Sequence, residues 1–365
     1  MTATSHPEFN AQTEALEVAQ AFPEAIRDKT VVVTGVNPSG IGFATAQALA
    51  SQSPAHLIIT GRTLSKLQDS IDALKTAYPN VDYRLLQVDL SSQRSVRAAA
   101  AELLSWTDVP TVDMLINSAG VALIPERTLS EDGIELTFAT NHVGHFLFTC
   151  LIMPRLIKAA EQQKNKNKGA TRIVNVSSGS PLFAGMRWSD VNFERHNADL
   201  PPEETPNYDM HRRFGIMDAE SRAYTPLEAY NQSKVANVLF GIGLTKRLYE
   251  RYGILSLAVH PGVIRTELGR DAVAETKRAI EGLMEEGVYK YKTLGAGAAT
   301  SLVAALDPGL GVGPVGEVRE GRENYGAFLV DCQVSDAAGP RAVSGDEAER
   351  LWELSERLVG EKFKW

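Results

Sequence analysis

The stretch Thr34-Gly35-Val36-Asn37-Pro38-Ser39-Gly40-Ile41-Gly42 directly follows a β-branched run and opens a helical pattern. A dinucleotide-binding turn needs this position, because glycines let the backbone approach a pyrophosphate and the helix N-terminus offers unpaired N–H groups. A glycine triplet alone is often only a tight turn, so its place between a strand and a helix supports the prediction. The candidate cofactor-binding residues of this turn are Gly35, Asn37, Ser39, Gly40, Ile41 and Gly42.

Outward from this turn, short β-branched runs alternate with longer helical patterns. Strands are predicted over Thr30 to Val33, His56 to Thr60, Tyr83 to Val88, Val112 to Asn117, Arg172 to Ser177, Leu255 to His260 and Ala327 to Val330. Helices are predicted over Ile41 to Ser51, Leu64 to Ala77, Ser92 to Ser105, Phe138 to Ala160 and Leu227 to Tyr252. This alternation predicts an α/β fold, a single Rossmann-type, doubly wound parallel sheet of about seven strands with helices on both faces.

Other segments decorate this domain. Residues 181–226 carry clustered prolines, acids and aromatics, which predicts a long insertion before the helix at 227–252. Residues 268–291 form a charged helical stretch at the sheet edge where open α/β folds bind ligands. The lysine-rich run 164–168 is predicted to be a solvated loop. The domain organisation is an N-terminal arm at 1–29 that could form an amphipathic helix, a main domain at 30–335 and a C-terminal helical tail at 336–365.

Composition excludes several classes of protein. The 365 residues are 44% hydrophobic and 22% charged, enough to bury a full core. The net charge of -8 argues against nucleic acid or an anionic membrane as a main partner. Cys150 and Cys332 stand in no metal-ligand or redox spacing, so no metal site is predicted. We find no signal-peptide core and no stretch approaching a membrane span, which predicts a cytoplasmic protein without a membrane anchor.

The ends of the second and third strands suggest which dinucleotide is bound. Arg62 stands where an enzyme that prefers NAD usually has an acid to bind the adenosine ribose. A guanidinium can pair with a 2′-phosphate, so NADP(H) is the predicted cofactor, although Arg62 could also be a surface arginine beside the next helix. Asp89 and Leu90 could contact adenine, or Asp89 could cap the helix that starts near Ser92.

The run Tyr230-Asn231-Gln232-Ser233-Lys234 places a phenol and an ammonium four residues apart on one helix face. The positive charge is expected to lower the phenol pKa, ordinarily about 10, so that the tyrosine can pass a proton near neutral pH. Such a pair alone is more often a solvated face. The preceding strand end, Ile173-Val174-Asn175-Val176-Ser177-Ser178, favours an oxidoreductase active site.

Together these residues resemble the short-chain dehydrogenase/reductase superfamily, specifically its retinol-dehydrogenase-like and WW-domain-oxidoreductase-like branch. The match runs from about Thr30 to Val330. Besides the runs quoted above, it includes Asn117-Ser118-Ala119-Gly120, Asn141-His142-Val143-Gly144-His145-Phe146, Val235-Ala236-Asn237-Val238-Leu239-Phe240 and His260-Pro261-Gly262-Val263-Ile264-Arg265-Thr266. The run 308–316 and the tail 321–365 resemble extended fungal-type members, which often serve secondary metabolism.

The resemblance implies roles for individual residues. Tyr230 would be the general acid in reduction and the base in oxidation, while Lys234 would lower its pKa and hold the nicotinamide ribose. Ser178, rather than Ser177, would donate a hydrogen bond to the substrate oxygen. Asn141 would position a water for proton supply, or would be a helix-interior asparagine satisfied by backbone. The cofactor contacts implied beyond the first turn are Asn117, Ala119 and Gly120, Tyr230 and Lys234, and Pro261, Gly262, Val263 and Thr266.

Departures from the family pattern affect the details. Four residues rather than three separate Gly35 from Gly40, so the phosphate loop should bulge by one residue. The gap from Ser178 to Tyr230 is far longer than usual, which changes the expected pocket. Its candidate substrate residues are Phe183, Met186, Trp188 and Phe214.

The predicted function is an NADP(H)-dependent ketoreductase or alcohol dehydrogenase that acts on a lipophilic, bulky and partly aromatic small molecule. An epimerase or dehydratase on the same scaffold, and a non-catalytic NADP(H)-sensing protein, are the alternatives. The helices at 138–160 and 227–252 form the family's usual dimer face, so a homodimer could form. Their apolar side chains could equally be core.

Overall fold

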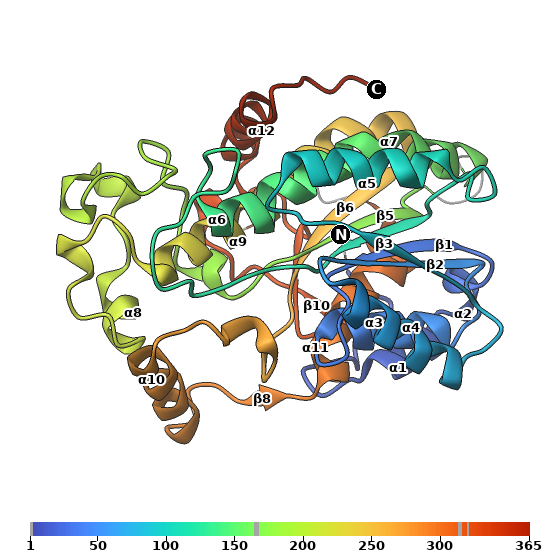
Figure 1. Cartoon of the computed structure of the whole chain (residues 1–365), viewed down its shortest axis with the longest axis horizontal. Helices are drawn as coiled ribbons and strands as arrows, with labels where there is room; N and C mark the ends of the chain where they lie inside the picture. Colours follow the sequence, from blue (N-terminus) through green and yellow to red (C-terminus); the bar gives the residue numbers. More distant parts are fainter. Residues whose placement is uncertain (1–2, 164–167, 313–315, 320) are drawn as a thin grey trace.

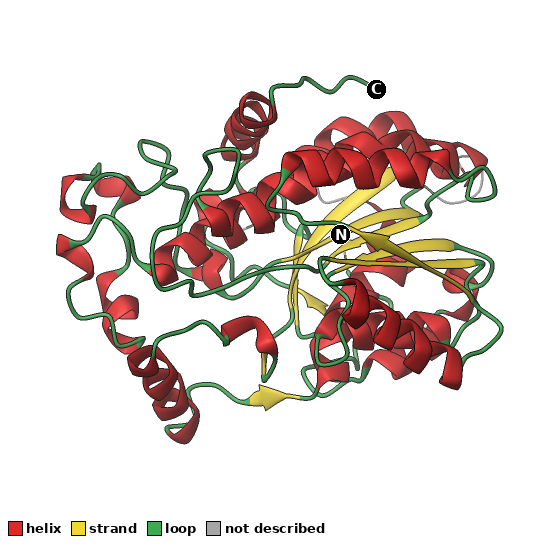
Figure 2. Ribbon diagram, in the orientation of Figure 1, coloured by secondary structure: helices red, strands yellow, loops and turns green. Residues whose placement is uncertain are grey.

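The structure is a computed structural model that describes residues 3–163, 168–312, 316–319 and 321–365. The run 164–168, predicted to be a solvated loop, lies outside these residues except for Lys168. A twisted central sheet with helices on both sides dominates the molecule (Figure 2). The predicted fold class is therefore confirmed.

Eight strands form the sheet, in the order β10-β9-β6-β5-β4-β1-β2-β3. Their bounds are β1 Thr30–Thr34, β2 His56–Gly61, β3 Asp82–Gln87, β4 Met114–Asn117, β5 Thr171–Val176, β6 Ile254–His260, β9 Phe328–Val330 and β10 Gln333–Val334. Each predicted strand is present within two residues of its expected ends. The extra strand, β10, pairs antiparallel to β9, because Asp331 and Cys332 both have positive φ and so close a tight hairpin turn.

The strand order reverses between β1 and β4, which are hydrogen-bonded neighbours although two strands separate them in the chain. At such a switch point the connections leave toward opposite faces of the sheet and open a crevice at the carboxyl ends of the strands. The glycine turn, the Asn117-to-Gly120 loop and the Ser177-Ser178 pair all begin at this edge, after β1, β4 and β5. The topology therefore brings the predicted site together.

Two helical layers enclose the sheet (Figure 1). One layer contains α1 Ala15–Ala21, α3 Ile41–Ala50, α4 Leu64–Ala77 and α11 Leu294–Leu306. The other contains α5 Gln93–Ser105, α7 Gly144–Gln163, α9 Pro226–Tyr252 and α12 Gly345–Val359. Shorter helices are α2 Pro23–Ile26, α6 Leu136–Phe138, α8 Tyr208–Arg213 and α10 Ala274–Glu285. Each layer buries its own apolar cluster against one face of the sheet, and the N-terminal arm joins the first through α1.

The helix predicted over 138–160 is interrupted near its start by a π-helical turn. After α6, residues Ala139–Val143 form this turn before α7 begins at Gly144. Single π turns inside helices concentrate at functional sites because they re-aim side chains, and Asn141 lies within this one. The span Leu136–Gln162 is long and apolar enough to cross a membrane, which corrects the expectation that no stretch is. Most of it (72%) is buried inside the protein, as in a core helix.

Helix α9 carries the Tyr230-to-Lys234 run and has well-defined ends. At its start, the Thr225 hydroxyl accepts a hydrogen bond from the Glu228 N–H (3.2 Å), and Pro226 occupies the first helical position. At its end, Gly253 adopts a φ of 77°, the left-handed cap that glycine allows. These caps fix the register of a helix whose residues from Asn231 to Thr245 are all buried.

The insertion at 181–226 is an ordered segment built from α8 and short 3-10 turns. Its centre is Arg187, whose side chain is 1% exposed and pairs with Asp190 at 2.6 Å. The same guanidinium donates to Asn197 and to the Arg195 carbonyl, and it lies 4.7 Å from the Phe193 ring centroid. A buried charge with this many partners gives the insertion a polar core of its own.

The insertion reaches the segment that leaves the sheet after β6. That segment contains β7 Val263–Ile264, α10 and β8 Tyr291–Lys292, with β7 and β8 paired in parallel. A side chain on Gly215 would meet the Glu275 carbonyl at 3.2 Å, so the insertion packs directly on α10. Figure 1 shows both on the same side of the molecule, beyond the end of the sheet.

Helix α12 lies across α9 and the π turn. Trp352 contacts the aromatic rings of Phe146 and Phe240, at centroid distances of 5.0 and 6.3 Å. His142 and Ser355 share a 2.7 Å hydrogen bond. The C-terminal tail therefore covers the helix face that was predicted to form a homodimer. The apolar side chains of that face belong to the core of the same chain.

Candidate active site

The glycine turn after β1 packs closely against the loop after β4. Gly35 has a φ of 73°, and a Cβ there would lie 2.5 Å from the Ala119 Cα, so a larger residue would push the two loops apart. A Cβ on Gly42 would lie 2.7 Å from the Gly35 carbonyl oxygen. The turn residues Asn37 and Ser39 form a small loop in which the Ser39 N–H donates to the Asn37 side chain. Gly40 then caps α3, which starts at Ile41.

Thr34 and His145 fasten these loops to the helical layer. The Thr34 hydroxyl accepts hydrogen bonds from the N–H groups of Ser118 (2.9 Å) and Ala119 (3.0 Å). Its own hydrogen is therefore directed at His145 Nε2, 2.9 Å away, and Nδ1 donates to the Asn141 carbonyl. Burial lowers the pKa of His145 to about 4, so the ring is neutral, as this pattern requires.

Asn141 holds the loop at Gly120 and Val121 against α9. Its side-chain oxygen accepts from the Val121 N–H (2.8 Å), and its amide nitrogen donates to the Val121 carbonyl and to the Ser233 hydroxyl. A Cβ on Gly120 would lie 3.3 Å from Asn141 Oδ1 and 3.5 Å from Lys234 Nζ. The side chain thus matches the backbone-satisfied alternative, and its role in holding a water stays a prediction.

The two serines after β5 have different partners. The Ser177 hydroxyl donates to the Lys234 carbonyl at 2.6 Å and is fully committed to the helix. Ser178 instead faces the Tyr230 phenol, whose pKa it lowers, while its own hydroxyl donates to the Ser180 hydroxyl at 2.9 Å. The Lys234 ammonium donates to the Val176 carbonyl at 2.9 Å and lies 5.7 Å from the centre of the Tyr230 ring. Strand β5 and helix α9 therefore place Ser178, Tyr230 and Lys234 in one site.

The pKa of Tyr230 shifts in the opposite direction from the one expected. Burial raises it to about 12, and the neighbouring Ser178 hydroxyl opposes this rise. Burial also lowers the pKa of Lys234 to about 8. Desolvation of both side chains outweighs the attraction between them, and only that attraction was considered in the expectation from the sequence.

The residues predicted to contact the adenosine half of the cofactor differ in exposure and in bonding. Arg62 is exposed at the end of β2, and no side-chain partner for it exists within the described ranges. Asp89 accepts from the N–H and the hydroxyl of Ser91 and forms a local turn. Ser92, not Asp89, caps α5, and the contact of Asp89 with adenine stays a prediction. Leu90 is buried, and its carbonyl lies beneath Gly144.

Asn117 is committed to the sheet rather than directed outward. Its amide nitrogen donates to Asn175 at 3.0 Å and to Thr149 at 3.3 Å, and Asn175 continues this polar row to Ser256. The side chain is 2% exposed and bonded internally, and the expected contact of Asn117 with the adenosine half of the cofactor stays a prediction.

The segment that follows β6 forms another edge of the crevice. Pro261 is buried and Gly262 has a φ of 88°. Val263 belongs to β7, and the Thr266 hydroxyl accepts from the Leu268 N–H at the start of a short 3-10 turn. Lys66 and Glu267 form a 2.8 Å ion pair that links α4 to this segment. No group of three or more His, Cys, Asp or Glu side chains is placed to hold a metal ion within the described part of the chain.

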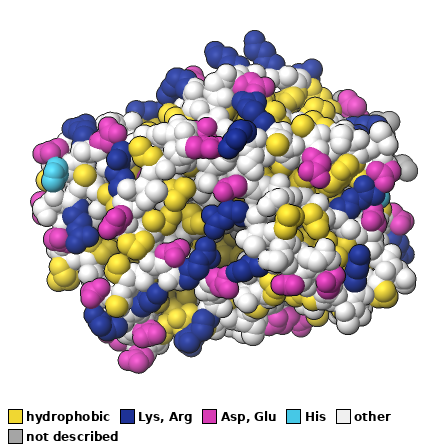
Figure 3. All heavy atoms as spheres, in the orientation of Figure 1, with side chains coloured by type: hydrophobic (Ala, Val, Ile, Leu, Met, Phe, Trp, Pro, Cys, Tyr) yellow, Lys and Arg dark blue, Asp and Glu magenta, His cyan; other side chains and the backbone are white. Residues whose placement is uncertain are grey.

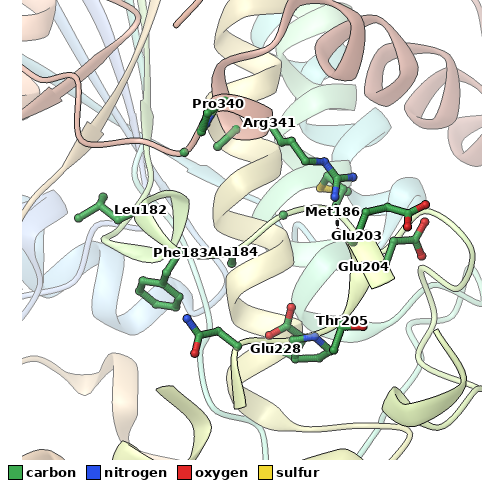
Figure 4. Close-up of a pocket in the computed structure, with 15 residues that line it drawn as sticks. Leu182, Phe183, Ala184, Met186, Glu203, Glu204, Thr205, Glu228, Pro340 and Arg341 are labelled. Carbon is green, nitrogen blue, oxygen red and sulfur yellow. Dashed lines mark hydrogen bonds between the residues drawn. The ribbon is translucent and has the colours of Figure 1, made fainter. Parts of the chain in front are cut away.

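A pocket of about 300 Å³ opens beside the site (Figure 4). Phe183 and Met186 line it, as predicted for substrate residues. Trp188 lies elsewhere, because its indole N–H donates to Glu347 of α12 and Arg350 covers its ring. Phe214 also lies outside this pocket, but it packs with Tyr230 in a separate apolar cluster.

That apolar cluster packs against the Tyr230 side chain. It joins the loop after β4, the insertion, the start of α9 and the α10 segment, through Ala122, Leu123, Tyr208, Phe214, Ile216, Ala219, Leu227, Ala272 and Ile280. The long insertion thus contributes hydrophobic surface directly at the reactive phenol.

Three buried polar residues near Ser178 were missed by the sequence analysis. Ser180, Asn231 and Glu228 form a hydrogen-bonded chain that starts at the Ser178 hydroxyl. The only sequence signal is that Asn231 adjoins Tyr230 and that Thr225-x-x-Glu228 fits a helix-capping box. Neither signal predicts that the carboxyl group turns toward Asn231.

Comparison with known proteins identifies the family. The short chain dehydrogenase family model matches residues 29–189. The chain is 40% identical to the oxidoreductase fscI of Fusarium equiseti, over 70% of this chain and 94% of that protein. It is 33% identical to human retinol dehydrogenase 12, over 92% of this chain and 87% of the relative.

A solved structure agrees. A protein from Mycobacterium paratuberculosis superimposes with a TM-score of 0.62 at 26% identity, covering 95% of this chain and 98% of that one. The fold, the match to the family model and the extent of the sequence identity all indicate the same family. This chain belongs to the short-chain dehydrogenase family, in its retinol-dehydrogenase-like branch, and is an oxidoreductase.

Proposed function

We propose that this protein is an NADP(H)-dependent oxidoreductase that interconverts a carbonyl and an alcohol on a lipophilic small molecule. The observation that supports this proposal most directly is the arrangement of Ser178, Tyr230 and Lys234. A hydroxyl and a phenol in mutual contact, with a buried ammonium beside them, can bind and protonate one oxygen atom. The site lies at the switch point of the sheet, where α/β folds bind their ligands.

The residues present fit an NADP-type dinucleotide. Gly35 and Gly42 leave room where a Cβ would meet backbone, so a pyrophosphate can approach the start of α3. Arg62 offers an exposed guanidinium at the ribose end, without a side-chain partner among the described residues, which suits a 2′-phosphate. The Lys234 ammonium faces Gly120 and lies where the nicotinamide ribose is expected.

NADPH, when bound, supplies a hydride for the carbonyl carbon. The chain's own residues handle the oxygen and the proton. Ser178 donates a hydrogen bond to the carbonyl oxygen and so stabilises the negative charge that develops there. Tyr230, held protonated by its raised pKa, transfers its proton to that oxygen, and the neighbouring Lys234 charge stabilises the phenolate that remains.

An apolar substrate is favoured by the surroundings of Tyr230. The cluster around the phenol ring is made of aliphatic and aromatic side chains from four segments. Large hydrophobic side chains are also exposed nearby, including Met217, Leu268 and Val273. Figure 3 shows hydrophobic side chains among charged ones on the side of the molecule where the insertion and α10 lie. A bulky aromatic or secondary-metabolite-like ketone or alcohol fits this environment.

The test is NADPH oxidation by the purified protein across a panel of bulky aromatic and aliphatic ketones and aldehydes. We expect turnover with NADPH, weaker turnover with NADH and loss of at least about 100-fold of activity in Tyr230→Phe, with NADPH binding retained. Tyr224→Phe is the matched control, because its hydroxyl donates to the Ile124 carbonyl outside the reactive trio. Comparable activity in Tyr230→Phe would refute the assigned chemistry.

Product analysis separates the alternatives. Conversion of substrate without net NADPH consumption would indicate an epimerase or dehydratase. NADPH binding without conversion of any compound would favour the sensor. We also propose that the protein works in the cytoplasm as a monomer, since the span-length apolar helix found among the described residues is mostly buried and α12 covers the usual dimer face. Recovery in a membrane fraction would contradict this location.

A further inference from the structure

A hydrogen-bonded chain runs from the Ser178 hydroxyl to a buried carboxyl group. The Ser178 Oγ lies 2.9 Å from the Ser180 Oγ, which lies 2.8 Å from the Asn231 side-chain oxygen. The Asn231 amide nitrogen is 3.2 Å from Glu228 Oε2. All four side chains are at most 9% exposed, so water cannot readily replace any of these bonds.

The donor directions along this chain are fixed by chemistry. A carboxylate at Glu228 can only accept, so Asn231 presents its NH₂ to Glu228 and its oxygen to Ser180. The single Ser180 hydrogen is then used on Asn231. The Ser178 hydrogen must therefore point at Ser180 Oγ, away from the substrate, and the Ser180 N–H already occupies one lone pair of Ser178.

Protonation of Glu228 allows the opposite order. A protonated carboxyl can donate to the Asn231 oxygen once the amide turns over, which directs the NH₂ at Ser180. Ser180 then donates to Ser178. With both lone pairs of Ser178 occupied, its hydrogen is released toward the Tyr230 oxygen, with which it is already in contact, and toward a substrate oxygen beside it.

The surroundings of Glu228 favour proton uptake. Burial raises the pKa of this carboxyl. His211 Nε2 lies 3.8 Å from Glu228 Oε2 and 2.9 Å from the Thr225 hydroxyl, while Nδ1 lies 2.9 Å from the Asn207 carbonyl, and the charge of this ring opposes the rise in the pKa of Glu228. The Arg187 guanidinium faces Glu228 from the insertion but is held by Asp190, and Tyr208 also faces the carboxyl.

Glu228 also has a route to solvent. It lines the 300 Å³ pocket, in which it lies beside Thr205, while Arg341 with Glu203 and Glu204 occupies another side (Figure 4). Arg341, Glu203 and Glu204 are the other charged residues that line the pocket with Glu228. A proton can therefore reach Glu228 from the pocket without passing through the cofactor crevice.

We propose that Glu228 is a positioning residue that determines, through Asn231 and Ser180, whether the Ser178 hydrogen is directed at Ser180 or at the substrate oxygen. The proposal rests on the function proposed above, because it assigns Ser178 to the substrate. It predicts a rate that depends on the protonation of a group outside the reactive trio.

The experiment measures kcat for NADPH-dependent reduction of phenanthrenequinone, a flat aromatic diketone, from about pH 5 to about pH 9. The wild type should lose roughly 10-fold in kcat as Glu228 ionises, since one donor to the developing oxyanion is withdrawn. Glu228→Gln can donate to Asn231 at every pH. Its kcat should therefore stay at the low-pH value over the range in which Glu228 ionises in the wild type. Ser180→Ala should abolish the same step, because the competing acceptor for the Ser178 hydrogen is gone.

Glu135→Gln is the matched control. Glu135 is another fully buried carboxyl whose pKa burial raises, but its oxygens accept from the Thr137 and Phe138 N–H groups, which do not belong to this hydrogen-bonded chain. It should keep the wild-type pH profile. A wild-type profile in Glu228→Gln or in Ser180→Ala, or a flat profile in Glu135→Gln, would overturn the proposal.

A second measurement is independent of turnover. Infrared difference spectra between acid and neutral pH should show the C=O band of a protonated carboxyl that is absent in Glu228→Gln, and its midpoint should shift in Ser180→Ala. An unshifted midpoint, or no such band, would reject the coupling even in an active enzyme. Absence of turnover together with a shifted midpoint would instead refute the proposed reaction and leave the hydrogen-bond chain supported.

Discussion

At the residue scale, Arg62 makes the cofactor assignment testable. Replacing it by aspartate removes a charge-assisted hydrogen bond and adds a charge that repels the 2′-phosphate. Such bonds contribute about 1.5–3 kcal/mol, so the Kd for NADPH should rise roughly 10- to 100-fold, with the Kd for NADH within about 3-fold of wild type. Fluorescence titration of both cofactors measures this.

Lys75→Asp is the control for Arg62→Asp, because Lys75 lies exposed in the last turn of α4, the helix that follows Arg62. It makes the same change in net charge away from the site. An equal loss of NADPH affinity in both variants would show that only the overall charge matters.

The pKa values of the reactive trio predict how the reduction rate changes with pH. With its pKa at about 12, Tyr230 stays protonated throughout the working range, so the phenol does not limit the reaction. Lys234, with its pKa at about 8, is charged below that pH and neutral above it. The kcat/KM for reduction should therefore fall as pH rises from about 7 to about 9.

This fall in kcat/KM should persist in Glu228→Gln, because that substitution removes only the pH dependence that comes from the ionisation of Glu228. Stopped-flow turnover in overlapping buffers would measure it. A kcat/KM that stays constant through this range would contradict the assignment of Lys234 as the charged partner.

At the element scale, the strands were predictable and the irregular elements were not. Alternating runs of β-branched residues and helical patterns locate seven parallel strands within two residues of their ends. The π turn at Ala139–Val143 has no such signal, since one shifted hydrogen bond leaves the hydrophobic period nearly unchanged. The β10 hairpin lacks the expected glycine and uses Asp331 and Cys332 instead.

The same limit applies to the site. The Ser178, Tyr230 and Lys234 trio follows from the sequence, because strand ends of a parallel sheet meet at one edge. The direction of the Tyr230 pKa, the internal bonds of Asn117 and the position of Trp188 do not, because each depends on how deeply a side chain is buried and on a partner distant in sequence.

The insertion is predicted to depend on Arg187. Replacing it by alanine leaves the Asp190 carboxylate buried without its cation, which typically costs about 3–5 kcal/mol. The loss should be local, so hydrogen exchange should speed up across residues 187–224 while β1 and β4 stay protected.

Arg195→Ala is the comparison, because the Arg195 side chain is exposed and bonds only to the nearby Asp199 carbonyl. It should change stability by less than about 0.5 kcal/mol. Uniform loss of protection across the sheet in Arg187→Ala would show that the insertion is not a separate unit of folding.

At the scale of the whole molecule, the C-terminal tail makes the proposed monomeric state testable. Trp352→Ala removes a ring that is 4% exposed and packed against Phe146 and Phe240. It should lower the free energy of unfolding by about 3–5 kcal/mol. Exposing this aromatic face should also promote self-association, measured by light scattering across a concentration series.

The neighbouring Glu353→Ala is the control, since that side chain is exposed on α12. It should leave both stability and mass unchanged. A stable dimer of the wild-type chain would contradict the conclusion that α12 replaces a partner subunit on this face.

The tail also has a consequence for the order in which the chain is made. Helix α12 is synthesised after α7 and α9, although it completes the cover over their aromatic side chains. Domains tend to fold from the N-terminus as they leave the ribosome. The growing protein therefore leaves these aromatic side chains exposed until α12 has been synthesised and has packed against α9.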